Sequence, residues 1–326
     1  MEVLLKHGTP QQQAKYLVPL LRGEIRSAFL MTEPDVASSD ATNMETKLTK
    51  VMVPSSRGSG GGKTKYKYIL SGRKWWSTGA MHPKCRVALV LARMDYSQLP
   101  ENMETASAHG AHTVVIVPMN KATPVRPLTV FGDDDAPTGH AEVLLDNIEL
   151  HDVEEALILG EGRGFEIAQS RLGPGRIHHC MRAVGMAARC YELMLERSLV
   201  RETFGQYIWE HGGCQELIAD SFSDLEAARL LTLNCAAAMD EHGVRKARGQ
   251  IASIKVSVPQ LTHRIVDRAI QIFGGAGVSD DFPMARILTG LRSLRIADGP
   301  DAVHRRTVAR LEIRKTEKRL EARSKL

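Results

Sequence analysis

The spacing of apolar residues changes about halfway along the chain. Between residues 26 and 150, apolar positions fall in short runs separated by turn-forming residues, which is typical of β-strands. From about residue 160 to 320 they recur every three or four positions, which predicts long amphipathic helices. The pattern therefore predicts an α+β protein in which a β domain precedes a helical domain. The β-like runs include Tyr68–Leu70, Val87–Arg93, Thr113–Val117 and Glu142–Leu145.

Three apolar stripes define the helical part, and we expect their helices to pack against one another. The first comprises Ile177, Met181, Val184, Ala188, Tyr191 and Leu195. The second comprises Ile218, Phe222, Leu225, Ala228, Leu231, Cys235 and Met239, and the third comprises Ile251, Ile254, Val258, Leu261, Ile265 and Ile272. Gly243 separates the second stripe from the third. Residues 1–22 are also amphipathic and predict a helix ahead of the β domain.

Three local signals refine the β domain. Ser71-Gly72 predicts a tight turn. The glycine- and serine-rich insert between Pro54 and Thr64 predicts a flexible surface loop, because no helix signal follows it. Trp75 and Trp76 are adjacent on a predicted strand, so their side chains should point to opposite faces of the sheet. We therefore expect Trp75 to have a structural role.

Composition and charge exclude several classes of protein. The 326 residues include 43 basic and 38 acidic side chains, and this net charge of +5 is scattered, unlike the basic patch of a nucleic-acid-binding protein. No apolar run is long enough to span a membrane. The five cysteines form no CxxC pair, which favours reduced thiols inside a cell. His178-His179-Cys180 is not expected to bind metal, because adjacent histidines cannot share one helix face.

The stretch from Gln271 to His304 carries the strongest sign of chemistry. Small residues after Phe273 close a helix and let a ligand approach the backbone, because glycine has no Cβ. Residues 283–294 can form the next helix. Asp298 then lies in an Ala-Asp-Gly-Pro corner, which presents one carboxylate on a turn. His304, with Arg305 and Arg306, is expected on a solvated helix face, and the alternative is that these residues touch the substrate or a phosphate.

Four motifs in order resemble those of the acyl-CoA dehydrogenase family. They are Met31-Thr32-Glu33-Pro34 with Ser38-Ser39-Asp40, Lys74-Trp75-Trp76-Ser77-Thr78-Gly79, Arg201-Glu202-Thr203-Phe204-Gly205, and Gln271-Ile272-Phe273-Gly274-Gly275 with the Asp298 corner. The Ala-Asp-Gly-Pro-Asp form resembles the branch that contains family members ten and eleven. The resemblance implies a middle β-barrel or sandwich domain at 26–155 and a C-terminal four-helix bundle at 156–320. Residues 1–25 would be the remnant of an N-terminal helical domain, and 321–326 a targeting tail.

The same resemblance implies FAD as the cofactor and assigns its contacts. Thr32 and the backbone of Met31 would face the flavin ring with Phe29 nearby, and Ser39 would contact the phosphate region. Trp76 would pack on the isoalloxazine, and Thr78 would hydrogen-bond flavin N5. The remaining cofactor residues would reach the FAD of a neighbouring subunit, which implies a homodimer or a dimer of dimers. These residues are Arg201, Phe204, Gln271, Gly274 and Gly275.

The resemblance also names the base. Asp298 stands where the family usually has glutamate, and Gly299 follows it as in the family. Arg176 matches an arginine near the coenzyme A and base region. Some members carry the base at the preceding position, which is Gly175 here, and this favours Asp298.

The implied function is FAD-dependent oxidation of an acyl-CoA to a trans-2-enoyl-CoA in fatty-acid β-oxidation, with electron-transfer flavoprotein as the acceptor. Two alternatives stay open. One is a peroxisomal acyl-CoA oxidase, which passes electrons to dioxygen. The other is a non-catalytic protein that binds acyl-CoA or FAD, because the family's N-terminal helical domain is largely absent from this sequence.

The last three residues, Ser324-Lys325-Leu326, form the tripeptide read by the peroxisomal import receptor. A mitochondrial location is the alternative if a preceding segment carries a transit peptide. We expect a tagged copy to reach peroxisomes and a copy without this tripeptide to stay in the cytosol, as imaged beside a peroxisomal marker. Peroxisomal import of the shortened copy would contradict the targeting hypothesis.

Overall fold

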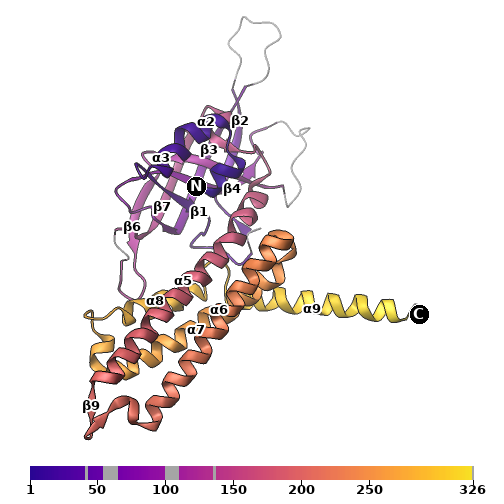
Figure 1. The fold of residues 1–326 in the computed structure, drawn as a ribbon. Helices are drawn as coiled ribbons and strands as arrows, with labels where there is room; N and C mark the ends of the chain where they lie inside the picture. Colours follow the sequence, from indigo (N-terminus) through magenta and orange to yellow (C-terminus); the bar gives the residue numbers. More distant parts are fainter. Residues whose placement is uncertain (41–42, 54–64, 100–109, 135–136, 325–326) are drawn as a thin grey trace, which may run out of the picture. The chain divides into compact units, whose positions relative to one another are not determined.

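The computed structural model describes residues 1–326 apart from 41–42, 54–64, 100–109, 135–136 and 325–326 (Figure 1). The predicted surface loop and the last two residues of the predicted tail lie outside this described part. The chain forms two compact units, Met1–Arg171 and Leu172–Leu326. The first contains a mixed β-sheet with short helices, and the second is helical, so the predicted α+β class is confirmed.

The amphipathic N-terminus folds as a series of short helices rather than as one. They are α1 (Glu2–His7), α2 (Pro10–Gln12), the π-helical η1 (Gln13–Leu17) and α3 (Val18–Leu21). Gly8 is extended (φ −74°, ψ 145°) and ends α1. The Thr9 side chain then accepts a hydrogen bond from the Gln12 backbone N–H at 3.2 Å, which caps α2.

An eight-stranded mixed sheet forms the body of the first unit. Its strand order is β6-β7-β3-β2-β4-β5-β8, and β1 pairs in parallel with β4. The short helix α4 (Val153–Ala156) precedes the last strand. The strands are β1 (Arg26–Leu30), β2 (Lys47–Val53), β3 (Lys65–Thr78), β4 (Cys85–Asp95), β5 (His112–Pro118), β6 (Thr123–Leu128), β7 (His140–Leu150) and β8 (Leu157–Ile158).

Strand β4 is buried on both faces. Val87, Leu89 and Leu91 pack with the N-terminal helices, whereas Ala88 and Val90 enter a second core on the other side of the sheet. A strand covered on both sides loses the alternation of apolar and polar residues. This explains why residues 87–92 form one continuous apolar run.

The predicted turn at Ser71-Gly72 is wrong, because both residues lie inside β3. The pairing of β3 with β7 shifts between Leu70 and Gly72, so the chain forms a bulge there. A Cβ on Gly72 would lie 2.4 Å from Thr46 Oγ1. Glycine is needed here because two segments of the chain pack closely together. From the sequence alone, a glycine that allows close packing looks the same as a glycine that forms a turn.

Long helices form the second unit, and the first of them, α5, begins within the first unit (Figure 1). Gly160 and Gly162 adopt positive φ and turn the chain into α5. The helices are α5 (Gly164–Val200), α6 (Gly212–Lys246), α7 (Arg248–Phe273), α8 (Met284–Leu294) and α9 (Asp301–Arg323). Between α5 and α6 lie β9 (Glu202–Thr203), β10 (Gln206–Tyr207) and the 3₁₀ helix η3 (Ile208–Glu210), and η4 (Gly274–Val278) follows α7.

The core of the second unit is built around α7. Ile251, Ile254 and Val258 of α7 pack with Cys180 of α5 and Cys235 of α6. Gly243 leaves the helical conformation (φ 77°, ψ 160°) inside α6, which confirms the predicted break near that residue. All five cysteines are thiols, as expected. Among the residues that the structure describes, no helix is both long and apolar enough to cross a membrane.

A buried ion pair ties two segments of the first unit together. The Lys74 Nζ of β3 lies 2.8 Å from Glu33 Oε1 and donates to the Met31 carbonyl at 3.0 Å. The Lys74 side chain is 0% exposed and that of Glu33 is 4% exposed. Glu33 also accepts hydrogen bonds from the backbone N–H groups of Glu45 (2.6 Å) and Thr46 (3.0 Å). Glu33 and Lys74 each belong to one of the two motifs of this unit, but a contact between them was not predicted.

Each member of the pair shifts the pKa of the other toward its charged form. Burial lowers the pKa of Lys74 to about 8, against the opposing effect of the Glu33 charge. Burial alone would raise the pKa of Glu33, but the Lys74 charge and the hydrogen bonds from Thr46 and Glu45 outweigh it, so this pKa is lowered. Each charge therefore depends on the other for its stability in the interior.

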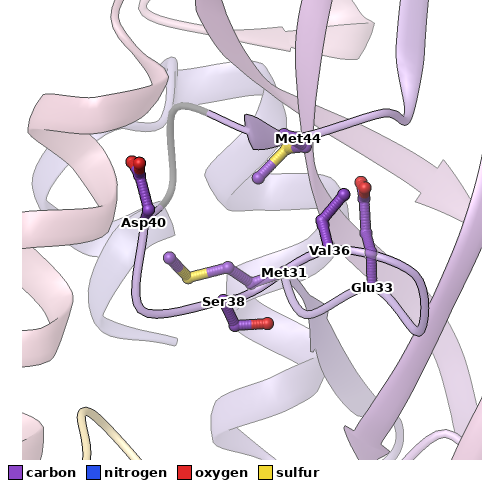
Figure 2. Close-up of a pocket in the computed structure, with 6 residues that line it drawn as sticks. All are labelled: Met31, Glu33, Val36, Ser38, Asp40 and Met44. Atoms are coloured by element: carbon purple, nitrogen blue, oxygen red, sulfur yellow. The ribbon is translucent and has the colours of Figure 1, made fainter.

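Six residues that follow β1 line a small pocket that is partly open to solvent, shown in Figure 2. Its volume is about 10 Å³, the space of one water molecule, so a dinucleotide cannot occupy it. Glu33 is shared between this pocket and the ion pair. The lining residues are Met31, Glu33, Val36, Ser38, Asp40 and Met44.

Removing one member of the buried pair should destabilise the first unit. We expect Lys74→Met to lower the free energy of unfolding by about 3–5 kcal/mol, because it leaves the Glu33 carboxylate buried without its cation. Chemical denaturation measures this change. Lys67→Met is the matched control on the same strand, because Lys67 pairs with Glu149 at 2.6 Å where solvent screens both charges. Equal losses from the two variants would contradict the prediction.

Candidate active site

Asp298 lies in a sharp turn between α8 and α9. The backbone N–H groups of Ile296 and Ala297 both donate to the Ser293 carbonyl at 2.9 Å, which closes the end of α8. Asp298 then adopts φ 54° and Gly299 adopts φ 101°. A positive φ is uncommon for a residue with a side chain, although aspartate tolerates it better than most. The predicted corner is therefore present, and Asp298 is held there in an unusual backbone conformation.

Two side chains hold the backbone carbonyl of Asp298. Arg176 Nε donates to it at 3.0 Å from α5, and His304 Nε2 lies 3.2 Å from it on α9. A carbonyl oxygen only accepts, so His304 must carry its proton on Nε2. A Cβ on Gly299 would lie 2.8 Å from His304 Nε2, so glycine is required here for this approach as well as for its φ. Arg176 and Gly299, two predicted substrate-site residues, thus lie beside Asp298.

The expectation that His304 is solvated is wrong. Its side chain is 3% exposed and lies beneath the Asp298 corner. Burial and the nearby Arg176 charge lower the pKa of His304 to about 4, so the imidazole is neutral at physiological pH. The neighbouring Arg305 and Arg306 are exposed, as expected. The sequence His304-Arg305-Arg306 is polar throughout, so it gave no sign that its first residue is buried.

The carboxylate of Asp298 faces α5. His179 Nε2 lies 3.1 Å from Asp298 Oδ2. A Cβ built on Gly175 would lie 3.4 Å from the same oxygen, so residue 175 faces the same carboxylate. For His179 the sequence pattern predicted only that it would not bind metal, and its contact with Asp298 was not predicted. The spacing of Arg176 and His179, three residues apart on one helix, is the signal that could have revealed it.

Helix α7 supports the corner from the core. Lys255 is 1% exposed and its Nζ donates to the Leu294 carbonyl at the end of α8. Burial lowers the pKa of Lys255. Asp301, the first residue of α9, accepts hydrogen bonds from Arg295 Nε at 2.9 Å and from Gln260 Nε2 at 3.2 Å. The turn is therefore fixed at both ends as well as at its centre.

In the first unit, the two tryptophans do not point to opposite faces as expected. Trp76 adopts φ 51° where the pairing of β3 with β7 shifts between Lys74 and Ser77. The two indole centroids lie only 6.0 Å apart. The Trp76 side chain remains 41% exposed. This bulge turns a large aromatic surface toward solvent, and such a surface suits a flat ligand.

The hydroxyl of Thr78 lies near this aromatic surface. Thr78 is exposed, and its Oγ1 is 3.0 Å from His140 Nδ1. The His140 ring also meets the Trp76 ring edge-on, with centroids 5.7 Å apart. His140, which was not among the predicted site residues, therefore contacts both β3 residues predicted to contact the flavin.

The remaining predicted flavin residues of this unit lie near β1. Phe29 is half-buried, and the Arg171 guanidinium lies 4.6 Å from the centre of its ring. Met31 and Thr32 are half-buried, and the Thr32 carbonyl accepts a hydrogen bond from the Trp75 backbone N–H at 3.0 Å. The two predicted flavin motifs of this unit are thus joined directly by their backbones. Ser39 is exposed farther along the loop.

The predicted cofactor residues of the second unit are exposed at two places. Arg201 and Phe204 belong to the hairpin of β9 and β10, and Phe204 is 99% exposed with φ 54°. Gln271, Gly274 and Gly275 lie at the end of α7, where Gly274 adopts φ 63° and terminates the helix. These residues offer a cation, an aromatic ring and open backbone, which match a pyrophosphate and a flat ring system.

The residues present fit the chemistry of FAD. In the first unit, the exposed indole of Trp76 and the hydroxyl of Thr78 suit a flavin ring, and in the second unit the exposed Arg201 suits a phosphate. The second unit also presents a carboxylate on a rigid turn, which can act as a general base. Within the described residues, no group of three or more histidine, cysteine, aspartate or glutamate side chains is arranged to hold a metal ion.

Comparisons with known proteins identify the family of both units. Residues 28–153 match the acyl-CoA dehydrogenase middle domain, and residues 162–312 match the acyl-CoA dehydrogenase C-terminal domain. The chain is 46% identical over 328 residues to acyl-CoA dehydrogenase family member 11 of Rattus norvegicus, covering 99% of this chain but only 39% of that relative. This match supports the resemblance to the branch of members ten and eleven.

Solved structures show the same fold. A structure from Mycobacterium abscessus, attributed to an acyl-CoA dehydrogenase, is 43% identical with a TM-score of 0.85, and the match covers 97% of this chain and 72% of that one. Butyryl-CoA dehydrogenase from Megasphaera elsdenii is 25% identical with a TM-score of 0.78, and the match covers 96% and 74% of the two chains. Both units of this protein, with the corner that carries Asp298, therefore belong to the acyl-CoA dehydrogenase family.

Proposed function

We propose that this chain carries the base and the flavin contacts of an FAD-dependent acyl-CoA dehydrogenase, which converts an acyl-CoA to a trans-2-enoyl-CoA in fatty-acid β-oxidation. The observation that carries the proposal is the Asp298 corner, in which Arg176 and His304 fix the carbonyl of a single carboxylate-bearing residue. The chain spans 39% of the length of its rat relative. We therefore propose the activity for a whole protein that includes these two units, and not for the two units by themselves.

Asp298 would remove the α-proton of the acyl thioester. The α-carbon is a weak acid, so the base must be ionised and aimed at the proton before reaction. Arg176 and Lys255 both interact electrostatically with Asp298, and their positive charges favour its ionised form. FAD, when bound, supplies the acceptor for the hydride that leaves the β-carbon.

Two sets of residues would hold the cofactor. Those of the first unit are Phe29, Met31, Thr32, Ser39, Trp76 and Thr78, which would contact the flavin and the phosphates of one FAD. Those of the second unit are Arg201, Phe204, Gln271, Gly274 and Gly275, which would complete the site of a second copy of the chain. The almost complete exposure of Phe204 supports an intersubunit role, because such a large apolar ring is usually covered.

Neutralising the base should stop the chemistry without disturbing binding. We expect Asp298→Asn to slow flavin bleaching by an acyl-CoA under anaerobic conditions by roughly 10²-fold or more, the usual scale for a lost general base. Stopped-flow absorbance with a panel of short, medium and long acyl-CoAs measures this rate. FAD content and acyl-CoA affinity should not change. Bleaching of the variant at the wild-type rate would show that Asp298 is not the base.

A longer carboxylate at the same corner tests the geometry. Asp298→Glu adds a methylene beside α5, which carries His179 and the Gly175 position. We expect lower activity than wild type in the same bleaching assay, because the corner is packed around the shorter side chain. Activity equal to wild type would show that the corner accepts either carboxylate.

FAD binding and subunit association should be coupled. We expect Arg201→Ala to lower the FAD content of the purified protein and to weaken its oligomer, because a cofactor shared by two subunits stabilises both. Light scattering after size-exclusion chromatography, with the flavin spectrum, measures the two quantities together. Arg189→Ala is a suitable control, because this exposed α5 arginine contacts Glu192 of its own helix. A monomer of the Arg201 variant that retains FAD fully would contradict the prediction.

A further inference from the structure

A row of polar residues on α5 runs alongside the candidate base. Arg176, His179 and Arg182 are spaced by three residues, which places them on neighbouring positions of one helix face. Arg176 donates to the Asp298 carbonyl, and His179 approaches the Asp298 carboxylate. One helix face therefore contacts both the backbone and the side chain of the same aspartate.

Arg182 determines which nitrogen of His179 carries the proton. Arg182 Nη2 lies 2.7 Å from His179 Nδ1. A guanidinium group has only donors, so Nδ1 must accept in this contact. The proton of the neutral ring is then on Nε2, the nitrogen that lies 3.1 Å from Asp298 Oδ2.

We propose that His179 is a positioning residue for the base, which holds the Asp298 carboxylate by donation from Nε2 in the tautomer set by Arg182. This inference rests on the proposed function of Asp298. Donation to Oδ2 fixes the rotation of the carboxylate, and so the direction from which it reaches an α-proton. It also favours the ionised carboxylate, which is the form that acts as a base.

The short side chain of aspartate makes this support important. Asp298 stands where the resemblance predicts a glutamate, and it has one rotatable bond fewer with which to reach the substrate. Gly175 leaves room for the arrangement, because a Cβ there would already touch Oδ2 at 3.4 Å. The His179 side chain is 25% exposed and that of Asp298 is 16% exposed, so the contact is largely shielded from water.

His179 acts as a donor and not as a proton relay. Its Nε2 already carries a proton, and its Nδ1 accepts from Arg182. The ring therefore has no vacant nitrogen for the proton that Asp298 removes.

Three variants on α5 test the proposal in the FAD-loaded protein. His179→Met removes the donor with little change in volume, and His179→Gln restores one, because its amide nitrogen is as many bonds from Cβ as Nε2. His178→Met is the matched control, since His178 is the adjacent, exposed histidine of the same helix. We expect His179→Met to slow anaerobic flavin bleaching at saturating acyl-CoA roughly tenfold or more, the scale of a lost hydrogen bond to a charged group.

The other readouts separate positioning from a purely structural role. FAD content, melting temperature and the dissociation constant for acyl-CoA should match wild type in His179→Met. His179→Gln should recover most of the rate, and His178→Met should change nothing. In an Asp298→Asn background, adding His179→Met should cause no further loss, because the residue acts through the carboxylate.

Two results would overturn the proposal. One is a wild-type bleaching rate in His179→Met, and the other is an equal loss from His179→Met whether residue 298 is aspartate or asparagine. Neither result would argue against Asp298 as the base, provided that the Asp298→Asn variant alone bleaches the flavin slowly. A wild-type rate in Asp298→Asn would instead reject the proposed base, so the two failures are distinguishable.

Discussion

Two hydrogen bonds to one backbone carbonyl determine the geometry of the candidate base. Arg176 of α5 and His304 of α9 hold the carbonyl of Asp298, whose positive φ costs about 1–3 kcal/mol by itself. Lys255 of α7 fixes the end of α8 just before the turn. The donors come from α5, α7 and α9, so the relative placement of these three helices sets where the carboxylate lies. The glycine at 299 allows His304 to approach and cannot be replaced without moving it.

The first unit prepares its part of the site by a different means. There the buried pair of Lys74 and Glu33 joins the segment containing Thr32 to the strand that carries Trp76. Two charges in an apolar interior stabilise little by themselves, but neither tolerates the loss of the other. The pair therefore fixes the position of the Thr32 segment against strand β3. The bulge that follows Lys74 in β3 turns Trp76 toward solvent.

The order of elements and the position of the corner could be predicted from the sequence, because both depend on local signals. The spacing of apolar residues predicted the change from strands to helices, and Asp298-Gly299-Pro300 predicted the turn. Neither the periodicity nor the resemblance predicted the contacts of His179, His304 and Lys74, since each joins residues distant in sequence or depends on which helix face is buried. The wrong turn at Gly72 has a similar cause: glycine there serves an approach to Thr46, and local sequence does not show that partner.

The central claim is that Asp298 lies against the α-carbon of a bound acyl thioester. The most direct test is a crystal structure of the FAD-loaded protein with an acyl-CoA analogue that cannot be oxidised. Our account predicts a carboxylate oxygen of Asp298 within about 3.5 Å of the analogue's α-carbon, the separation of a reactive pair, with its carbonyl still bound by Arg176 and His304. An α-carbon placed against another carboxylate, with Asp298 turned away from it, would contradict the account.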